Sequence, residues 1–211
     1  MAVNQQLIFR RYQLQINVTD QARFAAEGQY NMTTSLVTGP GTLAMYATHT
    51  DQVGTHNVIF ELYRDPTSYQ IHTNSPQFKR YGQLAQTVVT KKSIDELHLQ
   101  HIVSPPAGLM VSGTNTNQVL SLDFTIAPEL NTQFETDLAS QIAVRKQQLA
   151  LYTATFVDQT THWLILLTYL NQHDLANYSD QWLIWLKTYT ECIIKTVLDV
   201  DTMVMQPDLS D

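Results

Sequence analysis

Near the start of the chain, polar and apolar positions alternate with a period of two, and signals that begin and end a helix follow. Within residues 7–18, polar and apolar side chains alternate from Arg11 to Val18 and place Tyr12, Leu14, Ile16 and Val18 on one face, which predicts a strand. A helix is expected to begin at Thr19 or Asp20 and to end at Gly39, where a Gly-Pro-Gly sequence stops it. The first two predicted elements are therefore a strand and a helix.

A hairpin and a broken helix complete the first half. The apolar runs at residues 42–49 and 55–63 are rich in β-forming residues and are joined tightly, which predicts two antiparallel strands. Asp65-Pro66 and Ser75-Pro76 each place a capping oxygen before a proline, so one helix is expected to stop after two turns and another to start at once. Residues 94–103 predict a fourth strand. The predicted order is βαββαβ, with the second helix split in two.

The same pattern restarts after a stretch that is dense in Pro, Gly, Asn, Ser and Thr. The residues LAMY at 43–46 align with LALY at 149–152, and Tyr63 aligns with Tyr169, both at a separation of 106 residues. A period this long indicates two copies of a whole domain, because solenoid units are only about 20–50 residues long. We therefore expect a first domain at residues 1–104, a linker at 105–117 and a second domain at 118–211.

Each copy is expected to form a four-stranded antiparallel sheet with helices on one face, the ferredoxin-like arrangement of the α+β class. The other face stays uncovered within a copy, although the first strand places Phe9 there. On the third strand we expect Val58, Phe60 and Leu62 to face the helices, which leaves Tyr63 on the uncovered face. Two sheets packed face to face would bury both uncovered faces and form a pseudo-dimer within one chain.

Composition narrows the set of partners and sites. The chain has 12 Lys and Arg against 19 Asp and Glu, and its basic residues occur as scattered pairs, so nucleic acid is not an expected partner. The apolar stretches at 163–170 and 182–186 are shorter than the ~20 residues of a membrane span, and no export signal is recognised, so a soluble cytoplasmic protein without membrane contact is expected. The single cysteine, Cys192, excludes an intramolecular disulfide, and no glycine-rich nucleotide-binding motif is present.

Residues 60–81, FELYRDPTSYQIHTNSPQFKRY, resemble a motif of the antibiotic biosynthesis monooxygenase superfamily. The likeness consists of a Glu-x-aromatic strand end at Glu61, an Asp-Pro turn, and a helix break that holds His72 and is followed by Ser, a spacer and Phe-Lys. It covers residues 7–103 and extends more weakly to 118–206 through the repeat. The resemblance implies a dimeric-type α+β barrel, here built from two tandem ferredoxin-like units of one chain.

The superfamily includes cofactor-independent quinol monooxygenases and haem-degrading enzymes. In the haem-degrading branch a tryptophan and a histidine occupy the places that here hold His72 and Gly82, so no axial haem ligand is expected. The resemblance therefore implies a monooxygenase without a cofactor, which oxidises a small aromatic or quinol-type substrate with O2 in a cleft of the first domain.

Such a reaction needs a group that takes a proton from the substrate and donors that hold its oxygens. His72 is the first predicted catalytic residue, as general base or as hydrogen-bond partner of a phenol; a histidine satisfied by a backbone carbonyl remains an open alternative. Glu61 is the second, because a carboxylate in an apolar strand needs a partner, and an ion pair explains it as well as catalysis does. The predicted substrate-binding residues are Arg10, Tyr12, Phe60, Tyr69, Phe78 and Tyr81.

The second copy lacks most of these groups. Leu167 stands in place of Glu61, Trp182 stands in place of Phe78, and no histidine replaces His72. We therefore expect the second domain to be a structural partner of the first. The alternative from a different class is a non-catalytic small-molecule-binding or stress-related regulatory protein on the same fold.

The histidine spacing gives no sign of a metal site. His98 and His101 are three residues apart, and an odd spacing on a strand places them on opposite faces. No metal and no cofactor are expected, and the expected partner is a small aromatic molecule. Whether two chains associate beyond the intrachain pseudo-dimer is left open.

Overall fold

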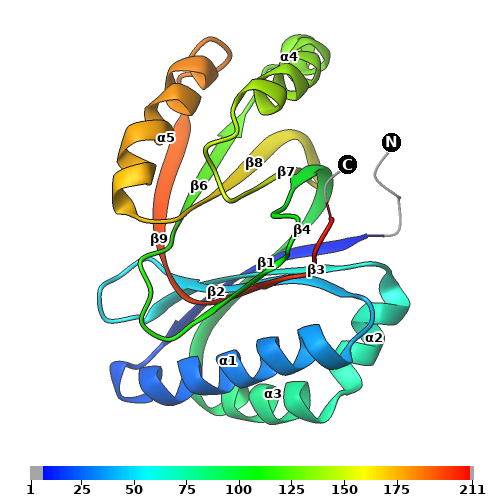
Figure 1. The fold of residues 1–211 in the computed structure, drawn as a ribbon, viewed down its shortest axis with the longest axis vertical. Helices are drawn as coiled ribbons and strands as arrows, with labels where there is room; N and C mark the ends of the chain where they lie inside the picture. Colours follow the sequence, from blue (N-terminus) through cyan, green and yellow to red (C-terminus); the bar gives the residue numbers. More distant parts are fainter. Residues whose placement is uncertain (1–6, 210–211) are drawn as a thin grey trace.

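The computed structural model describes residues 7–209, in which one antiparallel sheet is flanked by helices (Figure 1). The N-terminal half consists of β1 (Ile8–Ile16), η1 (Val18–Asp20), α1 (Gln21–Thr38), β2 (Thr42–His49), β3 (His56–Tyr63), α2 (Pro66–Asn74), α3 (Pro76–Val88) and β4 (Val89–Val103). The C-terminal half consists of β6 (Gln118–Thr125), η2 (Pro128–Leu130), α4 (Asn131–Val144), β7 (Ala150–Phe156), β8 (Gln159–Tyr169), α5 (Gln172–Leu186) and β9 (Ile193–Met205). Between the halves, β5 (Leu109–Ser112) lies in the predicted linker and pairs with β9.

Eight of these strands close into a barrel because the last strand of each half changes partner. The first part of β4 pairs with β1 up to Leu97, and its remainder pairs with β7 of the other half. In the same way β9 pairs with β6 up to Asp199 and then with β2. The order around the ring is β2-β3-β1-β4-β7-β8-β6-β9, and β9 returns to β2. The fold is thus a dimeric-type α+β barrel made by one chain, as the resemblance implied.

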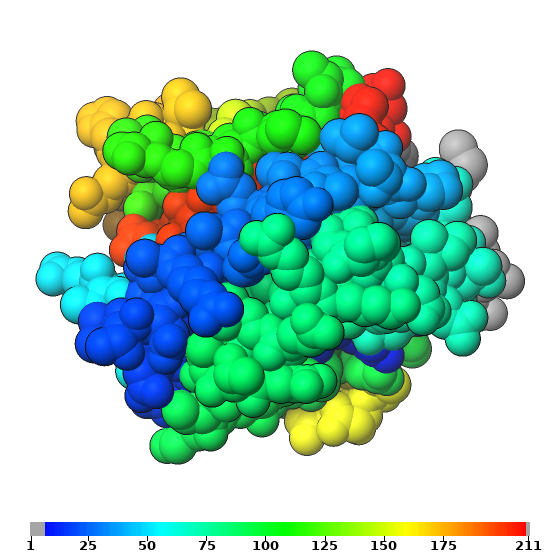
Figure 2. All heavy atoms as spheres, turned by 90° about the horizontal axis from the view of Figure 1, so that it is seen from below, coloured from blue at the N-terminus to red at the C-terminus, as the bar shows by residue number. Residues whose placement is uncertain are grey.

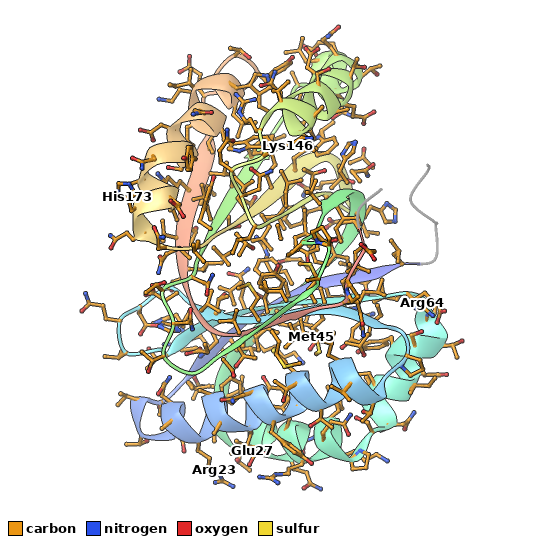
Figure 3. The ribbon with its side chains drawn as sticks, viewed as in Figure 1. Arg23, Glu27, Met45, Arg64, Lys146 and His173 are labelled. Atoms are coloured by element: carbon orange, nitrogen blue, oxygen red, sulfur yellow. The ribbon has the colours of Figure 1, made fainter. Side chains whose placement is uncertain are left out.

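The side chains form three apolar layers. The barrel interior is shared by the halves, with Phe9 and Tyr46 from the first packed against Tyr152 and Leu166 from the second. Figure 1 shows α1, α2 and α3 on one side of the barrel and α4 and α5 on the opposite side. Each helix group buries the outer face of its own half-sheet; Met45, labelled in Figure 3, lies in the layer between β2 and α1.

The internal duplication is visible in the register of the two hairpins. In the first, Tyr46 pairs with Phe60, and in the second, Tyr152 pairs with Leu166. Both members of the pair are shifted by 106 residues, the separation found in the sequence. The two hairpins therefore have the same strand pairing as well as similar residues.

The helix break after β3 forms where the two capping signals predict it. Asp65 Oδ1 accepts a hydrogen bond from the Ser68 amide at 2.7 Å and begins α2, and Ser75 Oγ accepts one from the Phe78 amide at 3.3 Å and begins α3. The C-terminal half has one such cap, at Asn171, and α5 runs unbroken over its 15 residues. The broken helix is therefore a feature that distinguishes the two halves.

The predicted orientation of β3 is wrong. Phe60 and Leu62 point into the barrel, whereas Ile59, Glu61 and Tyr63 face the helices. The error has a physical cause: the strand is buried on both faces, so its residues do not alternate between polar and apolar, and the sequence gives no period-two signal there. Phe60 consequently belongs to the barrel core.

The prediction that His98 and His101 lie on opposite faces is also wrong. The register between β4 and β7 shifts between Leu99 and His101, so His98 pairs with Thr155 and His101 pairs with Thr153. Partners two residues apart share a face, and the extra residue of the bulge brings the two histidines to the same side. No group of three or more His, Cys, Asp or Glu side chains that could hold a metal occurs within residues 7–209.

Among the helices described, none is long and apolar enough to cross a membrane.

Candidate active site

A cavity of about 470 Å³ lies between the sheet and the helices of the N-terminal half. Strands β1, β3 and β4 form one wall, and α2 and α3 form the other. Figure 2 shows this face of the molecule, where α1 and α3 lie side by side over the sheet. The volume is in the range of small-molecule sites, which are usually ~300–1,000 Å³.

The burial of the lining residues gives the cavity a floor and a mouth. Ile59, Glu61 and Tyr81 are each at most 9% exposed and form the deep end. Lys92 and the 47% exposed Ile94 lie at the outer end, on β4. A ligand would therefore enter between α3 and β4 and meet Glu61 last.

Glu61 is the titratable group at the floor. Its Oε2 accepts a hydrogen bond from the Tyr63 hydroxyl at 2.9 Å. Burial raises the pKa of Glu61 to about 7, although Tyr63 and the positive charges of Arg10 and Lys92 oppose the rise. A buried carboxyl group with a pKa near neutrality, in a cavity lined largely by aromatic and aliphatic side chains, is suited to accept a proton at physiological pH.

Aromatic and basic side chains from β1 and α2 surround Glu61. Arg10 lies across β1–β3 from Glu61 in register, and its guanidinium lies 4.4 Å from the centre of the Tyr69 ring while Nη2 donates to Glu96 at 2.7 Å. Burial raises the pKa of Tyr12, so its hydroxyl stays protonated and can donate a hydrogen bond. Five of the six predicted substrate-binding residues line this cavity: Arg10, Tyr12, Tyr69, Phe78 and Tyr81.

The sixth, Phe60, does not line the cavity, and this corrects the prediction. It is 1% exposed and packs in the barrel core, its ring centre 6.4 Å from that of Phe9. The error follows from the wrong orientation predicted for β3. In the structure Phe60 faces the barrel interior, whereas Ile59 and Glu61 face the cavity.

His72, the first predicted catalytic residue, lies behind the cavity wall and is not among the residues that line the cavity. It is 2% exposed, its Nδ1 lies 3.1 Å from Ser35 Oγ, and its ring packs against Tyr63 and Phe78 at centre distances of 5.2 and 4.8 Å. Burial lowers the pKa of His72 to about 4, so the ring is neutral at neutral pH. A buried neutral imidazole of this kind supports Phe78, which lines the cavity, without facing the cavity itself.

Lys92 was missed by the sequence analysis although it lines the cavity. The fourth strand was predicted to begin at residue 94, whereas β4 begins at Val89. The intervening Thr-Lys-Lys-Ser run is polar throughout and shows no alternation, so no signal marked it as a strand or assigned Lys92 to a face.

The C-terminal half has lost the polar groups of this site. In the matching register of β6 and β8, Leu120 and Leu167 stand where Arg10 and Glu61 pair, and both leucines are fully buried. Trp182 is 1% exposed and packs in the same apolar layer. Helices and sheet are therefore joined by apolar packing at the place that corresponds to the cavity.

Residues 9–84, which include most of the cavity wall, match the family model of the antibiotic biosynthesis monooxygenases. The N-terminal half therefore contains a segment that matches this family. The matched segment contains both Glu61 and His72.

Similar solved structures extend the likeness in fold over both halves of the chain. A proposed monooxygenase from Lactobacillus acidophilus NCFM superposes with a TM-score of 0.82 at 15% identity, covering 98% of this chain and 100% of the other. A proposed monooxygenase from Fusobacterium nucleatum gives 0.84 at 13% identity, with 98% and 97% covered. An anthrone oxidase-like protein gives 0.58 at 10% identity, with 100% and 98% covered. At these identities the likeness establishes the fold; no curated protein matches the sequence.

Gly41 is expected to position the helical wall of the cavity. A β-carbon at Gly41 would lie 1.8 Å from Ser68 Oγ and 2.2 Å from Ser68 Cβ, so Gly41→Ala should push α2 outward and carry Tyr69 with it. Misplacement on this scale is expected to lower kcat/KM by about tenfold to a hundredfold. The measurement is steady-state kinetics with any quinol that the protein oxidises.

A second substitution provides the control. Ser68→Gly removes both clashing atoms and leaves Ser68 Cα at 3.4 Å, so the Gly41→Ala/Ser68→Gly double variant should recover most of the loss. If the double variant remains as impaired as Gly41→Ala, then Gly41 does not act through its contact with α2.

Proposed function

We propose that the chain is a cofactor-independent monooxygenase that oxidises a small quinol-type aromatic with O2 in the N-terminal cavity. The observation that carries the proposal is the position of Glu61: a carboxyl group whose pKa is raised to about 7 lies at the floor of a cavity walled by aromatic side chains. A planar phenol matches the apolar walls, and its hydroxyl is the proton donor that such a carboxylate can use.

The proposed reaction uses the substrate as the source of electrons. Glu61 takes a phenolic proton, and the resulting quinolate passes one electron to O2. Superoxide and the semiquinone combine to form a C–O bond at a ring carbon, giving a hydroperoxide. Loss of water then breaks the O–O bond and the C–H bond at that carbon, so one quinol and one O2 give one hydroxyquinone and one water.

The remaining side chains are assigned supporting roles. Tyr12 and Arg10 supply hydrogen-bond donors and positive charge close to Glu61, where negative charge develops on the substrate oxygens. Tyr69, Phe78 and Tyr81 form walls that limit access of water to the quinolate. His72 holds Phe78 from behind and is not assigned a proton-transfer step.

The proposal is tested with an oxygen electrode and ¹⁸O2, using a panel of hydroquinones and naphthoquinols in chelator-treated buffer. We expect one O2 to be consumed per quinol, with one ¹⁸O atom in the product and the other in water. Formation of hydrogen peroxide with no label in the product would identify an oxidase instead. Quinol binding without oxygen uptake would favour the non-catalytic binding protein on the same fold.

A further inference from the structure

We infer that the cavity binds an aromatic acid, with the phenolic hydroxyl of the ligand at Glu61 and its carboxylate at Lys92. This inference narrows the substrate class of the proposed function. Only the placement of the hydroxyl at Glu61 rests on that proposed function; the placement of the carboxylate at Lys92 does not. Three observations on Lys92 support it: its lack of an acidic partner, its place at the mouth, and its loss in the C-terminal half.

Lys92 has no carboxylate partner within 4.0 Å in the described part of the chain, whereas the two arginines of β1 do. Arg10 is paired with Glu96 at 2.7 Å, and Arg11 is paired with Asp95 and Asp123, each at 2.7 Å. No ion pair joins Lys92 to any described acidic residue. Its ammonium lies 5.4 Å from the centre of the Tyr12 ring, a contact that leaves its hydrogen-bond donors free for an anion.

The position of Lys92 matches the outer end of a ligand that reaches the floor. Lys92 is exposed at the mouth, whereas Glu61 is 5% exposed at the deep end, and both line the same cavity. In the strand register, Ile59, Tyr12 and Ile94 lie at the level between Glu61 and Lys92, and all three line the cavity. A ligand with an apolar aromatic body, a hydroxyl at one end and an anionic group at the other therefore complements the cavity along its depth.

The C-terminal half gives an internal comparison. In β1–β4, Leu14 pairs with Lys92, and in the matching register of β6–β9, Phe124 pairs with Ile193. The half that lost the carboxyl group corresponding to Glu61 has also lost the cation corresponding to Lys92. The two charges at the ends of the cavity are present together in one half and absent together in the other.

A lysine at this place could also protect a strand edge, and the neighbouring Lys91 allows this explanation to be distinguished from ligand binding. The outer edge of β4 is unpaired between Val89 and Glu96, and lysines protect such edges from pairing with other chains. Lys91 lies on the same edge but on the opposite face, outside the cavity lining. Edge protection requires both lysines equally, whereas the ligand requires only Lys92.

The test is calorimetric titration of the full chain under anaerobic conditions. The probes are 1,4-dihydroxy-2-naphthoate and its uncharged methyl ester, and the proteins are the wild type, Lys92→Met and the matched control Lys91→Met. We expect the wild type and Lys91→Met to bind the acid about tenfold more tightly than the ester, and Lys92→Met to bind both equally. The preference for the acid should also weaken as salt is raised.

Equal affinity of the wild type for acid and ester would overturn the inference, and so would a loss of preference in Lys91→Met that matches the loss in Lys92→Met. Because binding is measured without O2, the outcome is independent of oxygenation. If the protein prefers the acid but takes up no oxygen, the role of Lys92 is supported and the monooxygenase activity is contradicted. If it turns over uncharged quinols but shows no preference for the acid, the monooxygenase activity is supported and the role of Lys92 is contradicted.

Discussion

Glu61→Gln is expected to lower kcat for quinol oxidation by about 10²-fold or more while the quinol still binds. An amide keeps the shape of the side chain and can still accept the hydrogen bond from Tyr63, but it cannot take a proton from the substrate. Loss of a positioned general base usually costs 10²–10⁴-fold in rate. Steady-state oxygen uptake gives kcat, and anaerobic titration gives the affinity.

The stability of Glu61→Gln separates lost chemistry from lost folding. The pKa of Glu61 is raised from 4.5 to about 7 by burial, so ionisation disfavours the folded state. This group's contribution to stability is fully present below pH 4.5 and is lost as pH rises through about 7, a difference of about 3 kcal/mol. The glutamine of Glu61→Gln does not ionise, so the variant does not lose stability as the pH rises. Urea unfolding at pH 8 should therefore give Glu61→Gln a free energy of unfolding at least as large as that of the wild type.

Glu135→Gln is the matched control, because Glu135 is an exposed carboxylate on α4, away from the cavity. Its kcat is expected to equal that of the wild type. If Glu61→Gln keeps wild-type turnover, Glu61 is not the base, and the tyrosines and Arg10 at the cavity wall become the candidates.

Trp182→Ala is expected to lower the free energy of unfolding by about 3–5 kcal/mol, the usual cost of truncating a buried aromatic. Trp182 is 1% exposed, its ring centre lies 5.9 Å from that of Trp185, and the Arg145 guanidinium lies 5.1 Å from it. These contacts are in the C-terminal half, so quinol affinity should stay within about twofold of the wild type after correction for unfolded protein.

Urea unfolding and anaerobic titration measure the two effects of Trp182→Ala. Trp163→Ala, in the same apolar layer and fully buried, should show the same separation of stability from affinity. A large loss of quinol affinity in both variants, at a temperature where they remain folded, would place a binding site in the C-terminal half and contradict the asymmetry between the halves.

The tandem fold was predictable because its signals are local and repeated. Asp65 and Ser75 cap two helices directly, and the LAMY and LALY hairpins show the duplication without any tertiary information. The changes of partner in β4 and β9, which close the barrel, depend on contacts between the halves. No pattern within either strand indicates where its partner changes.

The site was predictable as a set of residues and less so in its arrangement. Glu61 drew attention as the one carboxylate in an apolar strand, and that feature marked the correct wall. The faces of β3 could not be assigned, because a strand buried on both sides has no alternation, and so Phe60 was misplaced. His72 and Tyr69 are three residues apart on α2, and only the tertiary structure shows that His72 meets Ser35 of α1 whereas Tyr69 lines the cavity.

The central claim is that Glu61 takes the proton from the substrate in the N-terminal cavity. The pH dependence of kcat/KM, measured for the wild type, Glu61→Gln and His72→Gln, tests it most directly. The account predicts a rise in rate with an apparent pKa near 7 in the wild type, retained in His72→Gln and absent in Glu61→Gln. A rise that persists in Glu61→Gln and disappears in His72→Gln would contradict the account and return the proton transfer to His72.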